Sequence, residues 1–191
     1  MPSGTQTLHS GPFLGTYQIK ELGLSMVQVS VFSAVTVVVS VSALAVFGRL
    51  SKHRGMKGIM LAGLVISASA YLMVSLAAPG RGFVFFILYY AIHAIGESAT
   101  SIGISTMVMD IVAPDQCVSA MAIRSVVVGP AAFAVTIAMT PFLNFVQARG
   151  NELFGMTVYA QQLMGIMSFA VIMAAAGVYR IFSKKYERGA E

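Results

Sequence analysis

Five long apolar stretches follow one another along the chain, separated by short polar segments. Each stretch has at least ~20 residues, the length that an α-helix needs to cross the hydrocarbon core of a bilayer. Charged residues, glycine or proline bound each of them. The expected membrane spans are Leu24–Phe47, Gly58–Ala78, Phe83–Met109, Val118–Val146 and Met156–Phe182. The pattern therefore predicts an all-α protein, a multi-pass transmembrane helical bundle with five spans.

The composition leaves little room for a soluble domain. Hydrophobic residues make up 57% of the 191 residues and charged residues only 10%, whereas soluble domains carry about 25% charged residues. We expect residues 24–182 to form the membrane domain, residues 1–23 an extracytoplasmic lead-in and residues 183–191 a cytoplasmic tail. The single cysteine, Cys117, excludes an internal disulfide framework.

The net charge of +5 comes from basic residues that lie between the apolar stretches. Basic residues of short loops concentrate on the cytoplasmic side of membrane proteins. On one predicted side lie Arg49, Lys52, Arg54, Lys57, Arg124, Arg180, Lys184, Lys185 and Arg188. On the other lie only Lys20, Arg81 and Arg149. We expect a plasma or inner membrane protein with its N-terminus outside and its C-terminus in the cytoplasm.

The loop after the first stretch has a recognisable motif, Gly48-Arg49-Leu50-Ser51-Lys52-His53-Arg54-Gly55-Met56-Lys57. It resembles the cytoplasmic signature loop of the major facilitator superfamily, roughly G-x-L-a-D-R/K-x-G-R/K-R/K. Lys52 stands where the family has Asp, and Met56 replaces a basic residue. The resemblance implies a gating loop formed by Gly48, Arg49, Leu50, Lys52, Arg54, Gly55 and Lys57. The alternative is that these basic residues only orient the protein in the membrane.

Two further segments are similar to the same family. Leu22-Gly23-Leu24-Ser25 resembles the lead into its eighth helix, and Ala113-Pro114-Asp115-Gln116 resembles the loop between its tenth and eleventh helices. The resemblance implies helices eight to twelve, a partial major facilitator fold without the N-terminal part. Because the cavity of such transporters lies between two halves, we expect the missing N-terminal helices or another bundle as a partner. A truncated chain and a stand-alone protein both fit.

The third stretch carries a polar stripe. At 100° per residue, Tyr89, His93, Glu97 and Thr100 fall within an arc of about 80° on one helix face. A carboxylate near the middle of a membrane helix costs ~2.5–3.5 kcal/mol on insertion scales, and such residues tend to mark ion or substrate pathways. These four residues are therefore candidates for a substrate or proton pathway. The alternative is a structural role, with His93 and Tyr89 holding Glu97 between helices.

Arg124 lies near Asp110 and Asp115 in sequence, which predicts an ion pair. The chain has no phosphate-binding loop, no H-E-x-x-H and no G-x-S-x-G motif. We therefore expect no enzyme, no cofactor, no metal site and no nucleic-acid partner. The sequence favours transport of a small solute by part of a secondary transporter, with proton coupling as an option. A small non-transporting membrane protein that acts as an interaction or assembly partner is the alternative.

Overall fold

A computed structural model describes residues 14–15, 17–51, 56–148, 152–153, 156–157 and 159–188. Long helices dominate this part of the chain: α2 (Met26–Leu50), α3 (Met56–Leu76), α4 (Gly82–Ile111), α5 (Cys117–Ala148) and α6 (Ala160–Arg188). Each overlaps one of the predicted apolar stretches. The prediction of an all-α multi-pass bundle is confirmed.

Shorter elements lie at the chain reversals. A single π-helical turn, η1 (Tyr17–Glu21), precedes α2. Two-residue strands, β1 (Glu152–Leu153) and β2 (Met156–Thr157), pair antiparallel before α6. The fifth helix accordingly begins at Ala160, four residues after the predicted start of the fifth span at Met156, because residues 156–157 pair with β1.

Four helical segments among the described residues are long and apolar enough to cross a membrane: Met26–Leu50, Met56–Leu76, Gly82–Ile111 and Ala160–Ile181. Helix α5 contributes two shorter apolar segments, Cys117–Pro130 and Ile137–Val146, and has Pro130 and Pro141 within it. The protein is therefore membrane-embedded by length and composition of its helices, and the fifth span stays a prediction.

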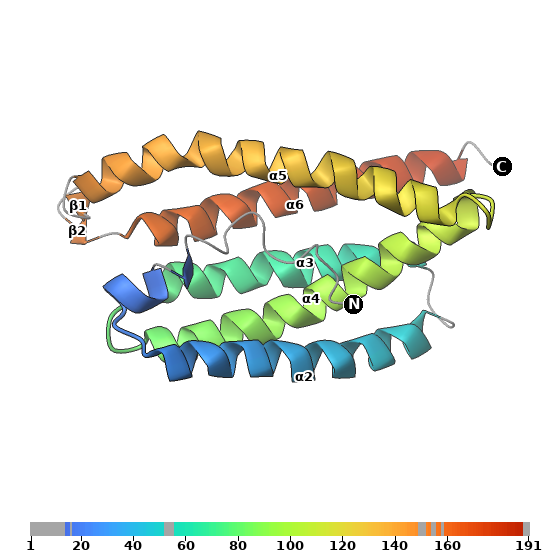
Figure 1. Ribbon diagram of the computed structural model, residues 1–191. Coiled ribbons are helices and arrows are strands. Elements are labelled where there is room, and N and C mark those ends of the chain that lie inside the picture. The colour runs from blue at the N-terminus through green and yellow to red at the C-terminus, as the bar shows by residue number, and fades with distance from the viewer. Residues whose placement is uncertain are drawn as a thin grey trace.

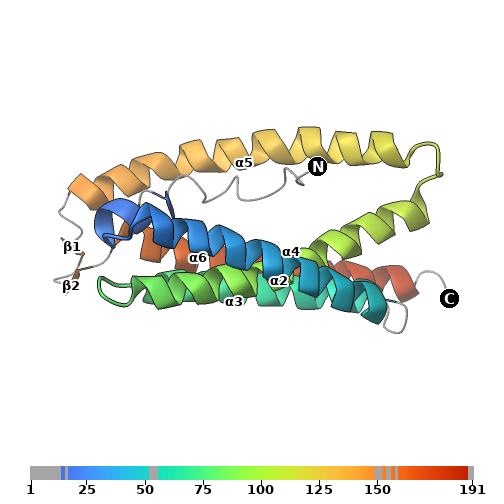
Figure 2. The same cartoon turned by 60° about the horizontal axis from the view of Figure 1, so that its bottom comes forward.

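Four of the helices form a layer in the order α2, α4, α3, α6, in which neighbours pack side by side (Figure 1). Consecutive helices run in opposite directions, so the loops gather at two ends. Helix α5 lies off this layer (Figure 2) and meets α6 where Val146 packs with Ala160 and Met164. The layer, and not α5, holds the larger core.

Small residues let α3 and α4 approach closely. A Cβ atom added at Gly63 would lie 2.8 Å from the backbone nitrogen of Thr100, and one added at Gly103 would lie 2.9 Å from Cβ of Met60. Gly96 likewise faces the backbone of Ser67. Contacts between small residues are a common way for helices to associate in lipid, where no hydrophobic effect drives them together.

Most of the basic residues described by the structure lie toward one end of the bundle, and Lys20 and Arg81 lie at the other. Arg49 is in the last turn of α2 and Lys57 in the first turn of α3. Arg124 is near the start of α5, and Arg180 is near the end of α6. Because the helices alternate in direction, these positions share an end (Figure 1). The opposite end holds η1 and the loop between α3 and α4.

Candidate functional site

The four residues of the predicted stripe divide between two environments. Tyr89 is 1% exposed and points into the core. Thr100 lies against Gly63 of α3 and donates its hydroxyl to the carbonyl oxygen of Gly96 at 2.9 Å. The side chains of His93 and Glu97 are 16% and 29% exposed. The stripe therefore has two packed members and two that keep some access to the outside of the layer.

His93 and Glu97 lie side by side, one helical turn apart. His93 Nδ1 is 3.7 Å from Glu97 Oε2. This separation exceeds the 2.7–3.2 Å range of good N–H···O hydrogen bonds. The structure thus brings the pair together, as the i, i+4 spacing predicts, and leaves the carboxylate able to accept further hydrogen bonds.

Aromatic rings from two helices surround His93. Tyr71 of α3 meets the imidazole nearly perpendicularly, with ring centroids 5.7 Å apart and an interplanar angle of 84°. Tyr89 lies on another side at 5.4 Å, and the two tyrosine rings contact each other at 5.6 Å. Edge-to-face geometry is the preferred arrangement of such rings. The imidazole is therefore held in place from both α3 and α4.

Tyr71 is a site residue that the sequence reasoning missed. It is a large, hydroxyl-bearing side chain in the middle of the apolar stretch Gly58–Ala78. Buried tyrosines usually direct their hydroxyl to a polar partner, and that is the signal that could have pointed to it. Its contact with His93 depends on the packing of α3 on α4, which no local pattern reveals.

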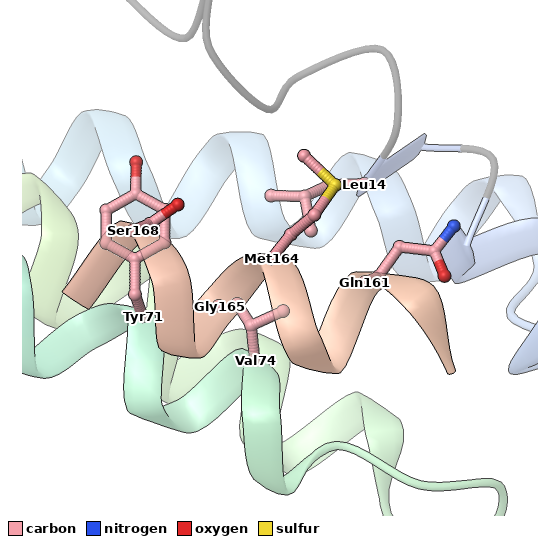
Figure 3. A pocket seen from close by; sticks show the side chains of 7 residues that line it. All are labelled: Leu14, Tyr71, Val74, Gln161, Met164, Gly165 and Ser168. Carbon is pink, nitrogen blue, oxygen red and sulfur yellow. The ribbon is translucent and has the colours of Figure 1, made fainter. Parts of the chain in front are cut away.

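A small cavity adjoins Tyr71 (Figure 3). It lies between α3, α6 and the segment before η1, and its volume of about 10 Å³ is close to the minimum that holds one water molecule. Its lining consists of Leu14, Tyr71, Val74, Gln161, Met164, Gly165 and Ser168. The side chain of Gln161 is nearly buried at the start of α6. Tyr71 thus stands between this cavity and His93.

The end of the bundle above the cavity is closed by hydrogen bonds to one carbonyl group. The oxygen of Ala77, just after α3, accepts from the hydroxyl of Tyr17 at 2.8 Å and from Nε2 of Gln162 at 2.6 Å. We call these three residues the clasp. Tyr17 is fully buried and Gln18 is 1% exposed, and Gln18 donates its amide to the hydroxyl of Tyr90 at 3.1 Å.

Local sequence explains how this segment turns back onto the bundle. Gly23 ends η1 with φ at +65°, a left-handed conformation that favours glycine. Ser25 then caps α2 in a reciprocal capping box with Gln28. In the segment Leu22–Ser25, which resembles the lead into a transporter helix, Gly23 terminates the helical turn and Ser25 begins the next helix. It directs Tyr17 under the ends of α3 and α4.

The predicted gating loop is described only at its edges. Gly48, Arg49 and Leu50 form the last turn of α2, and Lys57 belongs to the first turn of α3. The hydroxyl of Ser51 donates to the carbonyl of Gly48 at 2.8 Å. Lys52, Arg54 and Gly55 lie outside the described residues. The gating role stays a prediction.

The structure does not bring Arg124 together with its predicted partners. Asp110 is exposed near the end of α4, Asp115 is exposed in the turn that follows, and Arg124 lies two turns into α5. In the part of the chain that the structure describes, Arg124 forms no salt bridge with either aspartate. The turn from Val112 to Gln116 separates α4 from α5, so the sequence proximity does not become side-chain contact.

Among the described residues, no group of three or more His, Cys, Asp or Glu side chains is placed to hold a metal ion. Comparison with known proteins finds no matching family model, no matching curated protein and no matching solved structure.

Proposed function

We propose that this chain is part of a secondary transporter of the major facilitator type, which moves a small solute across a plasma or inner membrane. The observation that carries the proposal is the partly exposed pair of His93 and Glu97 halfway along α4, with His93 packed against Tyr71. In this proposal Glu97 binds and releases the coupling proton or contacts the solute. His93 is its partner, held in position by the surrounding rings.

The free-energy cost of placing a carboxyl group in the middle of a membrane span supports a functional role for Glu97. Placing Glu97 in the bilayer core costs ~2.5–3.5 kcal/mol on insertion scales. The 3.7 Å separation from His93 is too long for a strong hydrogen bond that would offset this cost. A residue kept only as a link between helices would gain stability from a shorter contact. A group that exchanges protons or ligands needs the access that Glu97 retains.

The size of the cavity between α3 and α6 supports the need for a partner. A volume of about 10 Å³ is far below the 300–1,000 Å³ typical of small-molecule sites. A solute pocket on the open side of His93 and Glu97 would therefore need a second wall. We propose that helices outside this chain, from the same protein or from another bundle, supply it. The resemblance of the loop after α2 to the facilitator signature supports the same arrangement.

The distribution of basic residues supports an orientation. Arg49, Lys57, Arg124 and Arg180 share one end of the bundle (Figure 1). By the positive-inside rule this end faces the cytoplasm. We propose that η1 and the clasp face outward and that the C-terminus is cytoplasmic.

Proton flux in membrane vesicles tests the proposal. Vesicles that carry the complete transporter, this chain together with the helices that complete its pocket, are energised to form a pH gradient, and a panel of sugars, amino acids and organic ions is added while a pH-sensitive dye is followed. We expect at least one solute to dissipate the gradient and Glu97→Gln to abolish that response. Glu21→Gln, a matched change in η1, should leave it intact. A response of normal rate and pH profile in Glu97→Gln would refute the role of Glu97.

A second candidate function is a small non-transporting membrane protein that binds another protein in the bilayer. The exposed apolar side chains along α2, among them Val37, Val38 and Val41, favour it, because such a surface accepts a neighbouring helix as readily as lipid. The genomic DNA before the codon for Met1 separates the two candidates. An in-frame segment encoding seven further spans supports the transporter, and a promoter with a start at Met1 supports the stand-alone partner.

A further inference from the structure

The clasp joins three parts of the chain that are far apart in sequence. Tyr17 comes from η1, Ala77 from the end of α3 and Gln162 from the start of α6. The last carbonyl groups of a helix have no partner within it, so the Ala77 oxygen depends on such outside donors. Water can replace both donors if the end of the bundle opens. The two hydrogen bonds of the clasp can therefore be exchanged for hydrogen bonds to water at little net cost.

Further contacts surround the clasp without adding a covalent or ionic tie. The ring of Tyr17 lies 5.5 Å from that of Tyr159 and 6.1 Å from that of Phe86. The backbone nitrogen of Tyr159 donates to Oε1 of Gln162 at 3.2 Å, and Ser75 donates its hydroxyl to the carbonyl of Gln162 at 3.0 Å. All of these are neutral contacts. Tyr17 is the member of the clasp that would leave it if η1 moved away as a unit.

The cavity lies directly beneath this closure. Leu14, three residues before Tyr17, forms part of its wall, and Gln161, next to Gln162, forms another part (Figure 3). Tyr71 lines the same cavity and contacts His93 on its other side. The closed end, a space for one water molecule and the ring of Tyr71 thus follow one another toward the partly exposed pair of His93 and Glu97.

We propose that the clasp is a gate, and that its opening admits water from this end of the bundle to the cavity and, past Tyr71, to His93 and Glu97. In the closed state Tyr17 and Gln162 share the carbonyl of Ala77. In the open state η1 moves away and water takes their place. The purpose of the gate rests on the proposed transport function, but its opening can be measured without any transport.

A buried cysteine reports the opening. In the full chain with Cys117→Ser, Val74→Cys places a thiol on the cavity wall at a position that is 1% exposed. The rate of its alkylation by N-ethylmaleimide in detergent micelles then measures how often the end opens. Ala94→Cys, also at a position 1% exposed but in the middle of α4, reports unfolding of the bundle as a whole.

Loss of the clasp should accelerate alkylation at the cavity alone. One hydrogen bond of typical net strength shifts an equilibrium about fivefold. We therefore expect Tyr17→Phe to raise the rate at Val74→Cys about fivefold, and Tyr17→Phe with Gln162→Leu about 25-fold. The rate at Ala94→Cys should stay unchanged. Lys20→Gln, an exposed change in the same segment, should change neither rate.

Two results would overturn the proposal. One is an unchanged rate at Val74→Cys in the double variant. The other is an equal increase at Val74→Cys and Ala94→Cys, which means that the variants loosen the whole bundle. Because alkylation needs no solute, either result leaves the transport proposal standing, and a failure to find transport leaves the gate measurable.

Discussion

Gly96 is the position where a single methyl group should do most to separate α3 from α4. A Cβ atom there would lie 2.5 Å from the backbone nitrogen of Ser67 and 2.8 Å from the carbonyl oxygen of Gly63. Ordinary contacts begin near 3.4 Å. Besides the side-chain hydroxyl oxygen of Ser67, these obstacles are backbone atoms of a neighbouring helix, so rotation of the serine side chain does not remove the clash. Gly96→Ala therefore forces the two helices apart by roughly 0.6–0.9 Å.

The expected cost follows from comparable core substitutions. Overpacking by one methyl group costs ~1–3 kcal/mol, whereas replacing a helical glycine by alanine gains ~0.5–1 kcal/mol through backbone entropy. Gly177→Ala in α6 measures this gain from backbone entropy alone, because nothing lies within 4 Å of its added Cβ. The free energy of unfolding of Gly96→Ala should thus lie ~1–3 kcal/mol below that of Gly177→Ala.

Reversible unfolding in mixed micelles, followed by circular dichroism, measures this difference. Both variants change glycine to alanine within a helix, so their difference removes the backbone contribution. If Gly96→Ala unfolds at the same denaturant fraction as Gly177→Ala, α3 and α4 do not pack through this glycine. The proposed position of His93 against Tyr71 would lose its support with it.

Three further predictions concern the polar cluster, the clasp and the orientation. Tyr71→Leu should unfold ~1–3 kcal/mol more easily than Tyr71→Phe, because only phenylalanine keeps the two aromatic contacts, each contributing ~0.5–1.5 kcal/mol; equal stability in the same micelle assay would contradict this. Burial, with smaller contributions from Tyr159 and Glu21, raises the pKa of Tyr17 above its ordinary value. The stabilisation that the neutral Tyr17 hydroxyl gives the folded protein is therefore complete below about pH 10 and is lost as the pH rises above it. If the melting temperature of the unchanged protein falls no faster above pH 10 than that of Tyr17→Phe, this prediction is contradicted. Green fluorescent protein fused after the C-terminus should fluoresce in cells, since it folds in the cytoplasm, and a dark fusion with active alkaline phosphatase at the same place would reverse the orientation.

The helices were predictable because their signal is local. Runs of apolar residues with little charge specify membrane-length helices whatever their neighbours, and α2 to α6 occupy the predicted stretches. The pairing of His93 with Glu97 was predictable for the same reason, since i, i+4 residues share a helix face. The start of α6 was not predictable in this way. Residues 156–157, which belong to the predicted fifth span, instead form a strand pair with residues 152–153.

Contacts between distant parts of the chain were beyond such patterns. Tyr71 reaches His93 only because glycines let α3 and α4 approach, and Tyr17 reaches Ala77 only because Gly23 turns the chain back. The glycines at 96 and 103 are seven residues apart and so lie on one helix face, which hints at close packing but names no partner. The expected pairing of Arg124 with nearby aspartates did not form, because the turn at Val112–Gln116 carries the chain away from α4.

The interface between α3 and α4 and the clasp are held by different kinds of contact, and this difference bears on which of the two can move. Between α3 and α4, glycine and small side chains place backbone against backbone, as at Gly63 and Gly96; such a contact loses dispersion energy steeply when the helices separate. At the clasp, two neutral hydrogen bonds meet at one carbonyl, and water can replace each of them at a net cost of ~0.5–1.5 kcal/mol. Breaking the two hydrogen bonds of the clasp therefore costs less than separating α3 from α4, whereas withdrawing η1 also exposes the buried ring of Tyr17. Motion confined to that end would change the access of water to His93 and Glu97 without moving the helices that position them.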